Sequence, residues 1–83
     1  MRNFSPLPSI PVIFGCEGPR LSDTERVFFR KYNPVGLILF ARNCETSGQV
    51  RELISDFKKS VTVPKPLILI DQEGGRVQRL TQP

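Results

Sequence analysis

The sequence has no histidine and no tryptophan, and it has only two cysteines, one methionine and one tyrosine. Without histidine, this chain by itself cannot build a His-based catalytic triad, general base or metal site. Cys16 and Cys44 do not form a Cys-x-x-Cys pair, so they indicate no disulfide framework. We therefore expect a cytoplasmic protein with reduced thiols.

Long apolar runs are missing as well. No run approaches the ~18 residues of a membrane-spanning helix, and residues 1–11 lack the apolar stretch of a secretory signal. The net charge is +4, from 12 basic and 8 acidic residues, without a dense Lys/Arg tract or interleaved aromatic residues. This composition predicts a mildly cationic, solvated surface, and neither a membrane nor a nucleic-acid partner.

Three short apolar runs predict buried strands at about 10–14, 36–40 and 67–71. Helical patterns lie between them, so we expect a β-α-β-α-β chain with parallel strands in the order 1-2-3 and right-handed crossovers. The 83 residues suffice for one small domain with a marginal core. The pattern alone does not distinguish a barrel segment from part of an open, doubly wound sheet.

Two capping boxes mark the expected helix starts. Ser22 opens a helix predicted at about 22–31, and Thr46 opens one predicted at about 47–60. In the second helix, apolar residues recur on one stripe that should pack on the sheet: Val50, Leu53, Ile54, Phe57 and Val61.

In the first helix, Val27, Phe28 and Tyr32 should share the buried face. The pair Phe28-Phe29 could also form a stacking platform for bases or sugars, but a capped amphipathic pattern favours core packing.

Polar residues and a glycine turn follow the third strand directly: Asp71, Glu73, Gly74, Gly75, Arg76 and Arg79. Ligands of parallel sheets bind beyond the carboxyl ends of the strands, so this stretch predicts a polar site at the mouth of the sheet. Arg42 and Asn43 follow the second strand. Either they line the same mouth, or Arg42 pairs with a carboxylate and Asn43 turns the loop.

Side chains alternate along a strand, so Asp71 shares one face of the third strand with Leu67 and Leu69. We expect this face to point away from the helices, with Leu37 and Leu39 of the second strand on the same side. Ile68 and Ile70 would then lie under the helices.

Sugar hydroxyls suit such a site, because a carboxylate accepts hydrogen bonds from them and an arginine donates to them. Two other classes of ligand are possible. A phosphate could bind because the Gly-Gly turn follows a strand, although no nucleotide-binding glycine motif is present. A hard cation could bind Asp71 and Glu73, but Arg76 and Arg79 leave little net negative charge there. We expect no metal and no cofactor.

The segment from Asp71 to Arg79 (DQEGGRVQR) resembles the signature of family 3 glycoside hydrolases, specifically bacterial β-N-acetylhexosaminidases. Residues 35–43 resemble the preceding strand of that family, and the resemblance extends from about Ile10 onward. It implies a β-α-β-α-β portion of a (β/α)8 TIM barrel. Such a barrel needs roughly 250 residues, so residues 1–83 would be the N-terminal part of an incomplete domain. The chain would be a truncated or split gene product or a piece of one, and a separate chain could complete the barrel.

The resemblance also implies hydrolysis of terminal β-linked N-acetylglucosamine from peptidoglycan-derived muropeptides in cell-wall recycling. In the family, the residues matching Asp71 and Arg79 bind the amino sugar. Glu73 and Arg76 would support the turn by a salt bridge, and an ion-pair network closing the loop is the alternative role for all four.

The family's nucleophile, an Asp after a much later strand, and its acid/base on a later loop match no position here. We therefore expect no catalytic residue in the chain and no hydrolysis by it alone. A non-catalytic remnant, or a weak sugar- or phosphate-binding module, is the alternative function.

Overall fold

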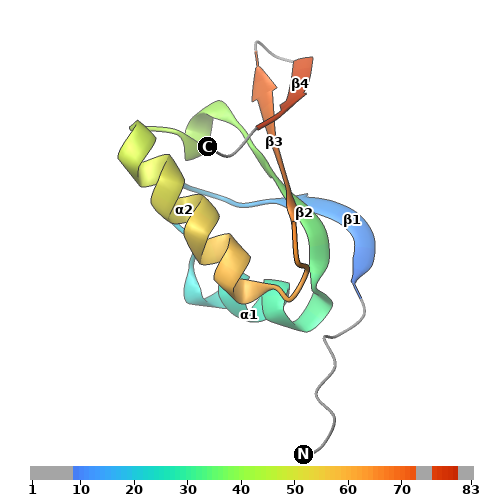
Figure 1. The fold of residues 1–83 in the computed structure, drawn as a ribbon. Coiled ribbons are helices and arrows are strands. Elements are labelled where there is room, and N and C mark those ends of the chain that lie inside the picture. Colours follow the sequence, from blue (N-terminus) through green and yellow to red (C-terminus); the bar gives the residue numbers. More distant parts are fainter. Residues whose placement is uncertain (1–8, 73–75, 81–83) are drawn as a thin grey trace, which may run out of the picture.

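The computed structural model describes residues 9–72 and 76–80, and the side chains of 9–71 and 77–80. Figure 1 shows a twisted sheet with two helices. The four strands are β1 (Ile10–Gly15), β2 (Pro34–Leu39), β3 (Leu67–Gln72) and β4 (Arg76–Arg79).

The strands lie in the order β1-β2-β3-β4. The β1–β2 and β2–β3 pairs are parallel, which confirms the predicted 1-2-3 order. The β3–β4 pair is antiparallel, and this fourth strand was not predicted. Its sequence, Arg76-Val77-Gln78-Arg79, lacks an apolar run, so its strand conformation depends on pairing with β3.

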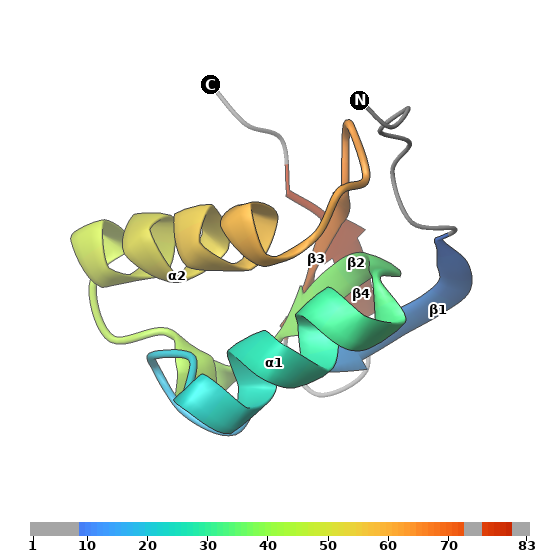
Figure 2. The same cartoon turned by 90° about the horizontal axis from the view of Figure 1, so that it is seen from below.

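The helices are α1 (Asp23–Tyr32) and α2 (Ser47–Ser60), and both predicted capping boxes are present. Asn33 ends α1 in the left-handed conformation, with φ of 52°. This sharp turn lets β2 begin at Pro34, two residues earlier than predicted, because proline is tolerated as the first residue of a strand. Both helices cover the same face of the sheet (Figure 2), as right-handed crossovers in this strand order require.

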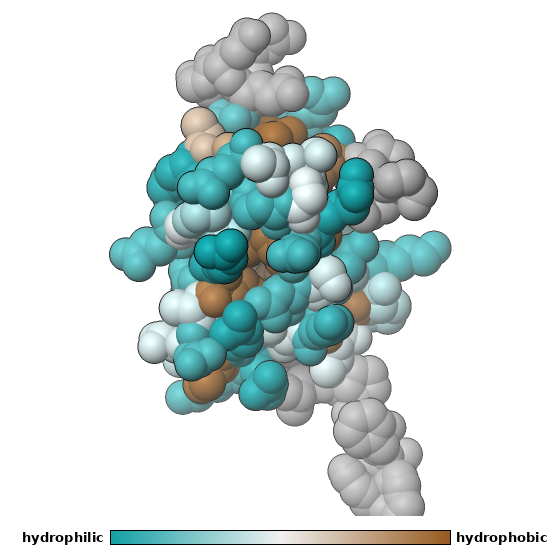
Figure 3. Space-filling model, turned by 90° about the vertical axis from the view of Figure 1, so that its left-hand side faces the viewer, coloured by the Kyte–Doolittle hydropathy of each residue, from teal (hydrophilic) through white to brown (hydrophobic). Residues whose placement is uncertain are grey.

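The core lies between the helices and the sheet. On α2 the predicted stripe is buried at Leu53, Ile54, Phe57 and Val61 and partly buried at Val50. Seen from the outer side of α2, most of the surface is hydrophilic, with scattered apolar side chains between the polar ones (Figure 3).

The buried face of α1 differs from the expected one. Phe29 is 2% exposed and packs edge-on against Phe57 of α2, with ring centroids 5.1 Å apart. Val27 and Tyr32 are exposed, and Phe28 lies at the border of exposure, packed against the Phe14 ring of β1 at 4.9 Å. The prediction for Val27, Phe28 and Tyr32 was wrong because the position of α2 selects which side of α1 is covered.

The inner face of β2 also differs from the expected one. Leu37 and Leu39 are fully buried in the core under the helices. They pair with Ile68 and Ile70 of β3, and paired residues of neighbouring strands point to the same face. The expectation for Ile68 is confirmed, whereas the expectation that Leu37 and Leu39 share the face of Leu67 was wrong.

Among the described residues, no helix combines the length and the apolar character needed to cross a membrane.

Candidate functional site

The candidate site lies at the edge of the sheet where β1, β2 and β3 end. Asp71 is half-buried near the end of β3, on the face opposite to the buried Ile68. Leu69 of that face pairs with Ile38, so Asp71 projects from the side of the sheet that the helices leave uncovered.

The β3–β4 hairpin brings Arg79 onto the same face as Asp71. Asp71 pairs with Val77, and Leu69 pairs with Arg79. Asp71 and Arg79 are therefore diagonal neighbours across an antiparallel pair. The Cα atoms of such neighbours are roughly 7–8 Å apart, which is within reach of a long side chain. Arg79 itself is exposed.

The other two signature residues are placed less completely. Arg76 begins β4 opposite Gln72, and its side chain is outside the described part. Glu73 lies outside the described residues altogether. The supporting salt bridge expected between them stays a prediction.

Phe40 follows β2 directly and lies on the site face. It comes after Leu39, the last β2 residue paired with β3, and two positions after Ile38, so Phe40 and Ile38 share a face. A Cβ added at Gly15 would lie 3.3 Å from Phe40 Cε2 and 3.8 Å from Ile38 Cγ2. The Phe40 ring thus covers Gly15 at the end of β1, on the face of Ile38.

Arg42 is held against this ring. It lies in the short 3-10 helix η1 (Ala41–Asn43) that follows β2. Its guanidinium carbon is 4.7 Å from the Phe40 ring centroid, and its Nη2 donates to the Cys16 carbonyl at 3.2 Å. Of the two interpretations of Arg42, the pairing with a carboxylate is not seen among the described residues, where a carbonyl and an aromatic ring hold this arginine.

Asn43 fastens the loops at this edge. Its side chain has no exposed surface, and its Nδ2 donates to the carbonyls of Cys16 (3.1 Å) and Gly18 (2.8 Å). Its Oδ1 accepts from the Phe40 amide at 2.8 Å. Gln49 of α2 donates to the carbonyls of Pro19 and Asn43. The interpretation of Asn43 as a loop-turning residue is confirmed.

The thiols near this edge are poor nucleophiles. Both cysteines are free, and burial, supported by the nearby Glu25 carboxylate, raises the pKa of Cys16 to about 11. Burial also raises the pKa of Cys44. Both thiols are therefore protonated at neutral pH. Within the described ranges, no group of three or more His, Cys, Asp or Glu residues could hold a metal ion.

The surface hollows lie apart from Asp71. One, of about 520 Å³, lies between the end of α2 and β4, where Lys58, Lys65 and Arg79 line it together with Ile68 and Leu80. A second, of about 370 Å³, lies beside the start of α2 and reaches Ile70. Ile68 and Ile70 meet the hollows from the helix side of the sheet, whereas Arg79, which lines the first hollow, belongs by its register to the opposite face.

Comparison with known proteins gives consistent matches. No protein-family model matches the sequence. The beta-hexosaminidase of Thioalkalivibrio sulfidiphilus is 40% identical over 72 residues, which are 87% of this chain and 20% of that protein. The beta-hexosaminidase of Pseudomonas aeruginosa is 46% identical over 65 residues, 78% of this chain and 19% of that protein.

The solved structures agree. NagZ from Neisseria gonorrhoeae, in complex with N-trifluoroacetyl-D-glucosamine, superposes with a TM-score of 0.72 at 34% identity, over 92% of this chain and 22% of that chain. The relatives are glycoside hydrolases. Over most of its length the chain is similar to a portion of the β-N-acetylhexosaminidases of glycoside hydrolase family 3, in agreement with the resemblance of its signature segment. It spans about one fifth of the length of the relatives it matches.

Proposed function

We propose that this chain is the sugar-binding first portion of a (β/α)8-barrel β-N-acetylhexosaminidase. The enzyme would remove terminal β-linked N-acetylglucosamine from peptidoglycan-derived muropeptides in the cytoplasm. Asp71 and Arg79 bind the amino sugar, and Glu73 with Arg76 holds the turn between them. The observation that carries the proposal is the shared face of Asp71 and Arg79 beside the carboxyl edge of the parallel strands.

The chemistry of this pair suits an N-acetyl amino sugar. A carboxylate accepts hydrogen bonds from one or two ring hydroxyls, and a guanidinium donates to hydroxyl or amide carbonyl oxygens. The Neisseria gonorrhoeae relative, solved with an N-acylated glucosamine, supports this class of ligand.

The catalytic groups would come from polypeptide beyond these residues. Glycoside hydrolysis by this route needs an acid at the leaving oxygen and a second group on the other side of the sugar. The remaining strands of the barrel, from the same or a separate chain, would cover Leu67 and Leu69 and carry the acid and the nucleophile.

The test is a chimera in which this chain replaces the matching segment of Neisseria gonorrhoeae NagZ. We expect it to release the chromophore of a nitrophenyl β-N-acetylglucosaminide. Asp71→Asn and Arg79→Gln should each lower kcat/KM about 10- to 100-fold, because each removes charge-assisted hydrogen bonds of about 1.5–3 kcal/mol. Glu52→Gln, at an exposed carboxylate of α2, is the matched control and should change kcat/KM less than twofold.

Unchanged kinetics in Asp71→Asn would refute the sugar-binding role. A folded chimera without sugar binding or turnover would favour the non-catalytic remnant. Residues 1–83 alone should show no turnover, and turnover that is lost in Asp71→Asn would show that the chemistry lies within this chain.

A further inference from the structure

A row of residues from three strands lines the carboxyl edge on the uncovered face of the sheet. Gly15 ends β1, the ring of Phe40 covers it from the end of β2, and Asp71 of β3 lies one strand further along. Neighbouring strands are about 4.8 Å apart. A ligand held by Asp71 and Arg79 on β3 and β4 therefore extends over Phe40 when it continues toward β1.

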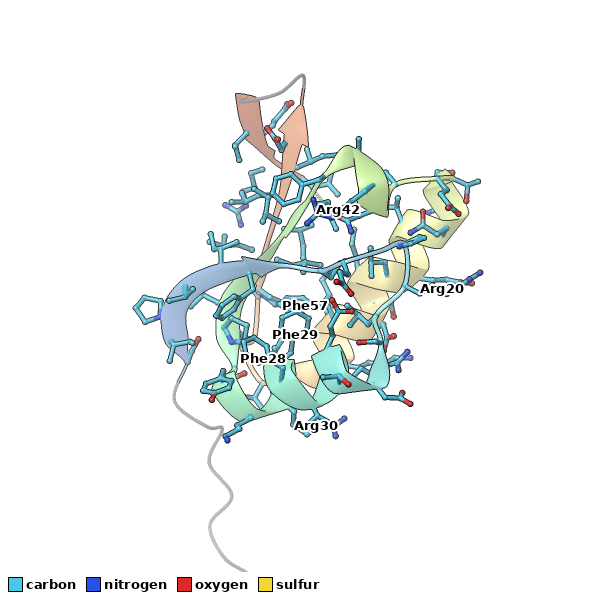
Figure 4. All side chains as sticks on the ribbon, turned by 180° about the vertical axis from the view of Figure 1, so that it is seen from behind. Arg20, Phe28, Phe29, Arg30, Arg42 and Phe57 are labelled. Atoms are coloured by element: carbon cyan, nitrogen blue, oxygen red, sulfur yellow. The ribbon has the colours of Figure 1, made fainter. Side chains whose placement is uncertain are left out.

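Arg42 is fixed at the β1–β2 end of this row. Its guanidinium lies over the Phe40 ring, and the Cys16 carbonyl accepts a hydrogen bond from its Nη2. Asn43 binds the same carbonyl, so the acceptor that orients Arg42 is itself held in place. Figure 4 shows Arg42 toward the end of the sheet that carries the β3–β4 hairpin, far from Arg30 on α1.

The Arg42 guanidinium is accessible and held in one orientation, as a ligand-binding group requires. Arg42 is exposed, and among the described residues the Cys16 carbonyl is the hydrogen-bond acceptor of its guanidinium. A guanidinium stacked on a ring keeps its planar fork in one orientation, so little side-chain entropy is lost when it binds a carboxylate. The Glu25 carboxylate, which lies near Cys16, accepts hydrogen bonds from the backbone amides of Glu17 and Ser22.

We propose that Arg42 is a further substrate-binding residue, which takes a carboxylate on the group linked to the amino sugar. The inference rests on the proposed function and specifies its substrate class. Asp71 and Arg79 take the neutral sugar on β3 and β4, and Arg42 makes the β1–β2 end of the row cationic. The enzyme should therefore prefer glycosides whose leaving group is anionic.

The test compares two substrates of the chimera, a neutral nitrophenyl β-N-acetylglucosaminide and the same glycoside with a carboxylate on the aryl ring. In the unmutated chimera the carboxylated substrate should have the lower KM. Arg42→Gln should raise that KM about tenfold and leave the KM of the neutral substrate within twofold. Arg42→Lys, which keeps the charge but not the planar fork, should restore part of the preference.

Arg30→Gln is the matched control, since it removes the same charge from the exposed end of α1. It should change neither KM. Equal losses on both substrates in Arg42→Gln, or no loss on either, overturn the role of Arg42 alone. A folded chimera without turnover on either substrate overturns the proposed function and this inference with it.

Discussion

Removal of the Asn43 side chain should destabilise the carboxyl edge of the sheet. Its side-chain amide makes four hydrogen bonds. It donates to the carbonyls of Cys16 (3.1 Å) and Gly18 (2.8 Å) and, more weakly, to Cys16 Sγ (3.4 Å), and it accepts from the Phe40 amide at 2.8 Å. Each contributes about 0.5–1.5 kcal/mol net, and burial leaves the partners without water in the variant. Asn43→Ala should therefore lower the free energy of unfolding by about 3 kcal/mol.

The measurement is urea denaturation of the chimera with and without the substitution, together with amide hydrogen exchange in loop 16–19. Asn43→Asp keeps the acceptor for Phe40 but loses both donors, so it should be at least as destabilising as Asn43→Ala. Gln78→Ala, at an exposed polar residue of β4, is the control and should stay within about 0.5 kcal/mol. A loss below 1 kcal/mol in Asn43→Ala, with unchanged exchange in the loop, would refute the reasoning.

The remaining predictions concern two glycines and a thiol. A Cβ at Gly36 would lie 2.7 Å from the Leu67 carbonyl oxygen and 2.9 Å from Leu67 Cβ, so Gly36→Ala should cost about 1–3 kcal/mol by forcing β2 and β3 apart. A Cβ at Gly48 of α2 meets nothing within 4 Å, so Gly48→Ala should raise the free energy of unfolding by up to about 1 kcal/mol through helix propensity. The urea midpoint should therefore fall in Gly36→Ala and rise in Gly48→Ala, and a shift of both in the same direction would contradict this pair of predictions. Burial raises the pKa of Cys16 from 9.0 to about 11, so its stabilisation is complete below pH 9 and is lost as the pH rises through 11. Urea midpoints between pH 8 and 11 should fall less steeply in Cys16→Ala than in the unmutated chimera, and equal slopes would contradict the burial of this thiol.

Local patterns in the sequence predicted most of the elements correctly. The capping boxes at Ser22 and Thr46 place both helices within one residue, because a cap depends on side chains and amides of the same turn. The apolar runs of β1 and β3 and the stripe of α2 were equally clear. These features depend on residues that are close together in the chain, so the sequence alone is enough to predict them.

The errors concern residues whose environment is set from far away in the chain. The strands β2 and β3 are apolar on both faces, so periodicity does not fix which residues of β2 point inward. The register with β3 decides that Leu37 and Leu39 lie under the helices. Similarly, the neighbours Phe28 and Phe29 lie at the border between the buried and the exposed face of α1. Phe29 is the buried one because Phe57 of α2 packs against it.

The candidate site divides in the same way. The nine residues from Asp71 to Arg79 by themselves indicated the family that the chain resembles, because they are contiguous, and the sugar-binding role of Asp71 and Arg79 stays a prediction. Only the tertiary structure shows that Arg79 returns along β3 as part of an unpredicted strand and shares a face with Asp71. It alone brings Gly15, Phe40 and Arg42 together from two strand ends. The physical reason is that the register of the parallel strands β2 and β3 and the contact of Gly15 with Phe40 join residues 25 or more positions apart in the chain, whereas caps and turns depend on the next few residues.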